Sequence, residues 1–188
     1  MAKLAKFLYS TALVVITAWL CSYFTRYGIA NWYESFEKPA VTPPNEIFAP
    51  VWALIYGLMI VSFYQILTAA SSLRQTAGQL FVAQLLLQII WTFLFFYEGM
   101  LGAAFGVIVF LAVVVWQMIK VFKQIRPLAA YLNYPYLLWL CYAGFLNFVF
   151  LYAQGAVVEF CGFRLLISLF MSGLRPMLMP TQSSSAQR

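Results

Sequence analysis

The feature that most constrains this chain is a succession of long apolar runs that carry almost no charge. Only 9% of its 188 residues are charged, whereas a soluble domain has about 25%, and the mean hydropathy is +0.87. The first run, Phe7–Phe24, is long enough, at about 1.5 Å per residue, to cross most of a hydrocarbon core roughly 30 Å thick. We therefore predict an integral membrane protein.

Runs of this kind predict an all-α bundle of transmembrane helices, since a helix satisfies its own backbone hydrogen bonds within lipid. The five predicted spans are residues 7–24, 51–70, 80–97, 101–121 and 128–153. Lys3 and Lys6 precede the first run, as in a signal peptide, but no cleavage site of small residues follows it. We interpret it as a retained span. Residues 1–154 are expected to form the membrane domain.

Residues 155–188 are predicted to form a C-terminal extension. Within it, Phe160–Gly173 is apolar but short, and Arg164 interrupts it. A run of about 10–14 residues more often lies at the membrane interface or packs on a bundle than crosses the bilayer. Thr181–Arg188 is polar and rich in serine, which is typical of disorder. The pattern leaves the placement of this extra apolar segment open.

The one long polar interval, residues 25–50, lies between the first two spans and is interpreted as a lid. Four of the eight prolines lie in it: Pro39, Pro43, Pro44 and Pro50. Proline fixes its own φ and disfavours helix at the preceding residue, so the loop is expected to be stiff. The residues expected to be non-helical for this reason are Lys38, Thr42, Pro43 and Ala49. Pro50 is expected at the start of the second span, where proline is tolerated.

The cations indicate an orientation in the membrane rather than a nucleic-acid partner. Eleven Lys and Arg give a net charge of +6, but they lie singly between apolar runs, as the positive-inside rule predicts. With the N-terminus in the cytoplasm, the inner segments hold six cations: Lys3, Lys6, Arg74, Lys120, Lys123 and Arg126. The outer segments hold two, Arg26 and Lys38. We predict a multi-pass protein with a cytoplasmic N-terminus and no nucleic acid as a partner.

The absence of two residue types limits the catalytic and metal-binding sites that the chain can form. The chain has no histidine and no aspartate, which excludes a Ser-His-Asp or Cys-His catalytic arrangement, a histidine metal site and an ordinary proton shuttle near neutral pH. Cys21, Cys141 and Cys161 lie within or beside apolar runs, without the spacing of a zinc site or a disulfide framework. No catalytic residue and no metal site are predicted.

Three of the predicted spans carry aromatic and amide side chains at helical spacing, so that each stripe lies on one face. The stripes are Trp52, Tyr56, Met59 and Phe63; Gln84, Gln88, Trp91 and Phe95; and Trp139, Ala143, Asn147 and Phe150. Amides in hydrocarbon need partners, so Gln84, Gln88 and Asn147 are expected to face the bundle interior. Either these groups hold the helices together, or the stripes converge on a pocket in which Ala143 leaves room.

Four sequence motifs occur in order along about residues 32–154. They are Trp32 and Tyr33 with Lys38, Pro39, Pro43 and Pro44; Phe48, Val51, Trp52 and Tyr56; Gln84, Leu85, Trp91, Phe95 and Phe96; and Pro135, Tyr136, Trp139, Ala143, Leu146 and Asn147. In these residues the chain resembles the translocator protein family (TspO/MBR, the tryptophan-rich sensory or peripheral-type benzodiazepine receptor-like proteins). It departs from the family at four positions. The family usually has Trp at the positions of Val41 and Leu151, and Asn at those of Gln88 and Gln154.

The resemblance implies a five-helix membrane bundle, often a homodimer, whose first loop covers a pocket for porphyrins, sterol-like lipids and aromatic ligands. Carried over by position, the site residues are Trp32, Pro44, Trp52, Tyr56, Gln88, Trp91, Phe95, Trp139, Ala143, Leu146 and Asn147. The implied function is a receptor, sensor or carrier of tetrapyrroles such as haem precursors. No resident cofactor is expected, and without histidine a porphyrin or haem would be bound by shape rather than by an axial bond.

The sequence leaves several alternatives open for the function and the assembly of the protein. A light-dependent enzyme that degrades porphyrins would need neither acid nor base if a radical formed on Trp91 or Trp139. A transporter of the same ligands is less favoured, because the chain shows no inverted repeat and no ionisable residue deep in a span. The small residues Gly102 and Gly106 suit helix packing, either within the bundle or in a dimer.

Overall fold

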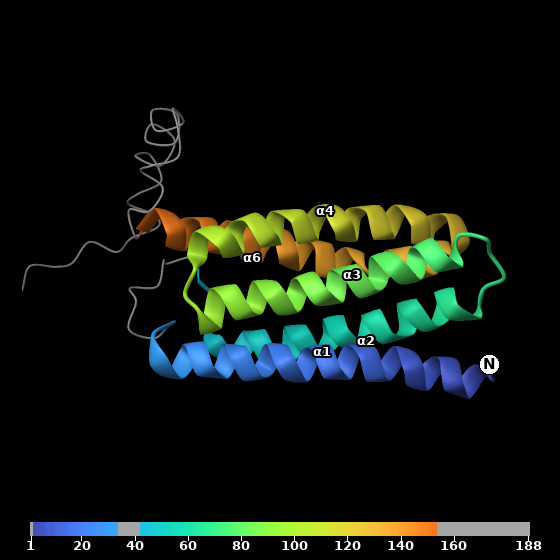
Figure 1. Cartoon of the computed structure of the whole chain (residues 1–188), viewed down its shortest axis with the longest axis horizontal. Helices are drawn as coiled ribbons and strands as arrows, with labels where there is room; N and C mark the ends of the chain where they lie inside the picture. The colour runs from blue at the N-terminus through green and yellow to red at the C-terminus, as the bar shows by residue number, and fades with distance from the viewer. Residues whose placement is uncertain (1, 34–41, 154–188) are drawn as a thin grey trace, which may run out of the picture.

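The computed structural model describes residues 2–33 and 42–153. These residues form a bundle of long helices lying side by side (Figure 1). The elements are α1 (Lys3–Asn31), α2 (Asn45–Thr68), α3 (Arg74–Thr92), the π-helical η2 (Phe93–Tyr97), α4 (Leu101–Ile125), α5 (Pro127–Tyr131) and α6 (Tyr134–Ala153). With η2 continuing α3 and α5 leading into α6, the described residues contain five segments that are long and apolar enough to cross a membrane. The predicted all-α, five-helix class is confirmed.

Glycine and proline mark the turns between helices. Between η2 and α4, Gly99 adopts a positive φ of 66°, a conformation that glycine enters without a steric penalty. Pro135 lies in the first turn of α6, where its missing N–H breaks no helical hydrogen bond. The regular part of the last span therefore begins only at Tyr134, after a short turn that separates it from α5.

The helices extend beyond the apolar runs, so the loop is shorter than predicted. Residues 25–31 belong to α1 and residues 45–50 belong to α2, because polar residues can continue a helix past the hydrocarbon that the hydropathy pattern detects. Ala49, which was expected to be non-helical, lies within α2, and Pro50 lies inside this helix instead of at its start. Pro44 forms the N-terminal cap.

Pro50 is the sixth residue of α2, so its missing N–H removes one intrahelical hydrogen bond near the beginning of the helix. Residues 34–41 of the predicted lid, with Lys38 and Pro39, lie outside the described residues, as does the predicted extension, residues 155–188.

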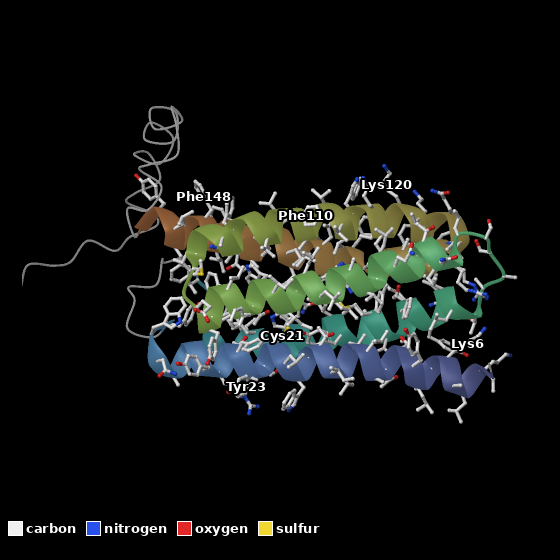
Figure 2. The ribbon with its side chains drawn as sticks, viewed as in Figure 1. Lys6, Cys21, Tyr23, Phe110, Lys120 and Phe148 are labelled. Carbon is white, nitrogen blue, oxygen red and sulfur yellow. The ribbon has the colours of Figure 1, made fainter. Side chains whose placement is uncertain are left out.

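The bundle packs α4 against α3 and α6, and α1 against α2, α3 and η2 (Figure 1). Between α2 and α3, Phe63 stacks on Phe81 with ring centroids 3.9 Å apart. The outside of the bundle is also apolar: Trp19 is 68% exposed, and Tyr23 and Phe110 point outward on opposite surfaces (Figure 2). Apolar side chains exposed in this number suit a protein surrounded by lipid.

A close helix contact at Gly28 holds α1 against η2. A Cβ atom at this buried position would lie 2.9 Å from the Cα of Phe96, closer than side chains pack, so only glycine fits without a shift. Gly57, exposed on α2, is the opposite case: among the described residues no heavy atom lies within 4 Å of the corresponding Cβ position.

The charged side chains divide between the two ends of the bundle. The end at which α1 begins and α4 terminates, which we call the cationic end, carries Lys3, Lys6, Arg74, Lys120, Lys123 and Arg126. Figure 2 labels Lys6 and Lys120 toward this end. Of the described residues, the acidic ones, Glu46 and Glu98, lie at the opposite end with Arg26. The grouping of cations fits the predicted orientation, which itself stays a prediction.

Candidate functional site

Aromatic side chains from α2 and α6 meet between these two helices, where Tyr136 is buried and the other rings are half-buried. Trp52 of α2 lies edge to face against Trp139 of α6, with ring centroids 6.4 Å apart and planes at 86°. Trp52 also stacks on Tyr56 at 5.3 Å. Phe48 packs edge-on against Trp139 at 5.8 Å, and Tyr136 lies 6.3 Å from Trp52. We call these five residues the α2–α6 ring cluster; such pairs contribute about 0.5–1.5 kcal/mol each beyond burial.

The amide of Gln88 connects this cluster to α3. Its Nε2 donates a hydrogen bond to the Tyr56 hydroxyl at 2.7 Å, and its Oε1 accepts one from the Tyr136 hydroxyl at 3.3 Å. Gln88 is 1% exposed, so both ends of a buried amide are satisfied, as an apolar environment requires. Polar groups from three helices thereby lie beside two tryptophan rings.

A second group of rings lies around η2, at the end of the bundle that carries Glu46 and Glu98. Its members, which we call the η2 ring cluster, are Trp32, Tyr33, Trp91, Phe95, Phe96 and Phe150. Trp91 lies 5.7 Å from Phe95, and Trp32 lies 6.0 Å from the same ring. The indole N–H of Trp32 donates to the Phe96 carbonyl at 2.8 Å. This contact fixes the start of the first loop against η2.

Asn147 ties the η2 ring cluster to two further helices. Its Oδ1 accepts a hydrogen bond from the Trp91 indole at 3.4 Å, and its Nδ2 donates to the Leu101 carbonyl at 3.0 Å. Asn147 is fully buried. The burial of Gln84, Gln88 and Asn147 confirms the expectation that they face the interior, but the Gln84 amide has no hydrogen-bond partner among the described residues. The Asn147 bonds hold α3, α4 and α6 together, while the Gln88 bonds lie directly beside the tryptophan rings.

Most of the residues that the sequence assigned to a site belong to these two clusters or form hydrogen bonds with them. Trp52, Tyr56 and Trp139 join around Gln88, whereas Trp32, Trp91 and Phe95 join around η2. Three further members lie on or near these groups: Ala143, half-buried, and Leu146 and Asn147, both buried, follow Trp139 along α6. Pro44 is exposed at the start of α2 and belongs to neither cluster.

Comparison with known proteins matches residues 10–153 to the TspO/MBR family, a segment that includes both ring clusters. The chain belongs to the TspO/MBR family. It is 33% identical over 141 residues to the translocator protein of Bos taurus, covering 73% of this chain and 83% of the relative. It is 30% identical over 147 residues to the tryptophan-rich protein TspO of Archaeoglobus fulgidus, covering 78% and 95%.

A third relative, the tryptophan-rich sensory protein of Cereibacter sphaeroides, is 30% identical over 118 residues, 63% of this chain and 73% of the relative. These relationships confirm the resemblance drawn from the tryptophan and proline motifs. Together with the five apolar helices, they make this TspO/MBR protein a multi-pass membrane protein.

Sequence reasoning missed members of both clusters in this TspO/MBR protein. Tyr136 precedes Trp139 by three residues and Phe48 precedes Trp52 by four, so helical spacing places each on the same face as its tryptophan. Extending each stripe by one turn toward the N-terminus would have found them. Tyr33 of the η2 ring cluster is 4% exposed, and burial, with a smaller effect of Tyr142, raises the pKa of Tyr33 to about 12.

A groove of about 620 Å³ lies elsewhere, between α4 and α6. We call it the α4–α6 groove. Its lining residues are Phe105, Ile108, Val109, Ala112, Val113, Trp116, Leu137, Leu140, Cys141, Gly144 and Phe145. This set contains no member of the predicted site, so the groove is a separate feature of this TspO/MBR protein.

Proposed function

We propose that this protein is a membrane receptor or sensor that binds a flat, hydrophobic ligand between α2, α3 and α6. The observation that carries the proposal is the meeting of Trp52 and Trp139 next to the Gln88 amide. Ligand sites are typically apolar and aromatic with a few convergent polar groups, and this arrangement offers both. The indole faces would hold the ligand, while the amide and the two tyrosine hydroxyls would orient it.

A porphyrin or another tetrapyrrole is the ligand class that fits these residues best. Its wide apolar faces match aromatic rings, which favour offset or edge-on contacts. Sterol-like and smaller aromatic molecules share this apolar character and are weaker candidates, because they offer less area to stack. The relatives named translocator protein and tryptophan-rich sensory protein agree with a role in sensing or carrying a small molecule.

The first loop is proposed to cover the site. Trp32, at the start of that loop, is already held against η2 by its hydrogen bond to Phe96. Pro44, at the other end of the loop, caps α2, one turn before Phe48 of the α2–α6 ring cluster. The loop therefore begins beside one ring cluster and ends beside the other, which supports a lid over both.

A homodimer also stays a proposal. Gly106 is exposed on α4, and among the described residues no heavy atom lies within 4 Å of the position its Cβ would take. Gly106, with the exposed Gly102 one turn before it, therefore leaves part of α4 open to a second copy. Chemical cross-linking in native membranes would show a band of twice the monomer mass if this is right, and only monomer if it is wrong.

Titration with protoporphyrin tests the binding proposal. Two double variants remove the same number of indoles: Trp52→Ala/Trp139→Ala from the α2–α6 ring cluster, and Trp19→Ala/Trp116→Ala from exposed positions. The absorbance band of the porphyrin reports binding in both. We expect the first variant to bind about ten-fold more weakly, since it loses ring contacts of about 0.5–1.5 kcal/mol each, and the second to bind like the native protein. Equal affinities in all three proteins would contradict the site.

A further inference from the structure

The α4–α6 groove opens on the outer surface of the bundle, where it meets the membrane. Val109, Val113 and Trp116 on its α4 side are 50%, 51% and 46% exposed, and Phe110 next to them points outward (Figure 2). Cys141 on its α6 side is also exposed. The volume of about 620 Å³ is within the roughly 300–1,000 Å³ of typical ligand sites. An occupant must come from the lipid phase, because the walls are apolar.

The length of the groove suits one lipid chain. Along α4 it runs from Phe105 to Trp116, which is about 16 Å at roughly 1.5 Å per residue. One leaflet contributes about half of a hydrocarbon core roughly 30 Å thick. The groove is therefore about as long as one leaflet is deep, and an extended acyl chain fits along it.

Two lysines continue the groove toward the cationic end. Lys120 and Lys123 follow Trp116 by four and seven residues on the same face of α4, and both are exposed. Among the described residues no acidic side chain lies at this end of the bundle, since Glu46 and Glu98 are at the other. A tryptophan beside lysines is typical of the level at which lipid headgroups lie.

We propose that the α4–α6 groove binds an anionic phospholipid, with one acyl chain along the groove and the phosphate at Lys120 and Lys123. Clusters of basic residues next to a span attract anionic headgroups, and the groove adds a shape that holds the chain. A second copy of the protein is disfavoured as occupant of this groove; the dimer proposed above would instead meet at Gly102 and Gly106, in the first two turns of α4 and away from the lysines. In the same bilayer orientation a copy in the groove would bring another pair of lysines to the same end, and like charges facing each other oppose association.

The thiol of Cys141 lines the groove and reports its occupation, whereas Cys21 is buried. In full-length protein carrying Cys161→Ser, the rate of reaction with an apolar maleimide is measured in detergent with added phosphatidylglycerol or phosphatidylcholine. We expect phosphatidylglycerol to slow labelling of Cys141 about ten-fold more than phosphatidylcholine does, because two lysines attract its headgroup.

Matched variants test the contribution of the lipid headgroup separately from that of the groove. Lys120→Gln/Lys123→Gln should abolish the difference between the two lipids, while Lys3→Gln/Lys6→Gln, at the same end but on α1, should keep it. For the groove, Gly144→Leu places bulk among the lining residues, and Gly57→Leu adds the same bulk at an open site on α2. Mass spectrometry of co-purified lipid should show less phosphatidylglycerol with the first glycine variant and unchanged amounts with the second.

Three results would overturn the proposal. Equal protection of Cys141 by both lipids would mean unspecific solvation, and equal loss in the two lysine variants would mean that the whole cationic end attracts the lipid without a site. A disulfide between Cys141 residues of two chains under mild oxidation would instead assign the groove to a second copy.

Discussion

The inward and outward faces of α6 have different partners, although both belong to one apolar helix. The inward face presents Tyr136, Trp139 and Asn147, whose hydroxyl, indole and amide meet α2, α3 and α4. The outward face presents Cys141 and Phe145, which line a groove whose other lining residues, among those the structure describes, are apolar. In lipid, apolar burial gains little between helices, so polar contacts and close packing decide which face turns inward. Mean hydropathy alone does not distinguish the faces.

The largest effect should follow from removing the inward amide. Asn147→Leu leaves the Trp91 indole N–H and the Leu101 carbonyl without the side-chain partner they now have. We expect a loss of about 2–3 kcal/mol of stability, since each unpaired buried group costs about 1–3 kcal/mol. Cys141→Leu, on the outward face, should change stability by less than about 0.5 kcal/mol. Thermal unfolding of both variants in one detergent measures this; equal melting temperatures would remove the distinction between the faces.

The same contrast between packed and open surfaces applies to two glycines on other helices. Gly28→Ala forces a Cβ against the Phe96 backbone, and overpacking of this kind costs about 1–3 kcal/mol. Gly57→Ala meets open space and should raise stability by up to about 1 kcal/mol through helix propensity. Chemical unfolding curves check the opposite signs, and a neutral Gly28→Ala variant would show that α1 and η2 are not held in close contact.

A smaller effect is expected at the hydroxyl of Tyr136. Tyr136→Phe removes the donor to the Gln88 Oε1 and should cost about 0.5–1.5 kcal/mol. Tyr131→Phe provides the control, because Tyr131 is 54% exposed on α5. If the proposed site is right, protoporphyrin affinity should fall in the first variant alone. Stability that falls equally in both would mean that the loss does not come from the hydrogen bond to Gln88.

The smallest effect should be that of pH. Burial raises the pKa of Tyr33 to about 12, above the usual value for tyrosine of about 10. The resulting stability is fully present below pH of about 10 and is lost as the pH rises through about 12. Melting temperatures should therefore be flat between about pH 6 and 9 and fall above pH of about 10. Tyr33→Phe should weaken that fall; an unchanged fall would assign it to other groups.

How much of the fold could be predicted depends on which structural features leave a pattern in the sequence. Long apolar runs predict the helices, because each must satisfy its backbone within lipid. The ends of those helices were predicted less well: α1 continues past Phe24 to Asn31, since hydropathy measures the hydrocarbon-facing part alone. The π-helical turn at Phe93–Tyr97 packs against α1, and no sequence pattern used above predicts it.

The candidate site, like the fold, could be predicted from the sequence only in part. Helical spacing placed Trp52 with Tyr56, and Gln88 with Trp91, on single faces of α2 and α3. Spacing within one helix carries no information on which neighbour it meets, so the contact of Trp52 with Trp139 required the structure. The groove between α4 and α6 was missed for a related reason, as its apolar lining resembles any lipid-facing surface.

The most direct test of the central claim is fluorine NMR of the protein labelled with 5-fluorotryptophan. All six tryptophans then report from one sample, each assigned by the signal lost in its Trp→Phe variant. On addition of protoporphyrin, the signals of Trp52, Trp91 and Trp139 should shift, while a spin-labelled lipid should broaden that of Trp19, which is 68% exposed, and spare Trp91, which is 6% exposed. Broadening of Trp91 by the lipid, with no response of Trp52 and Trp139 to the porphyrin, would contradict the account.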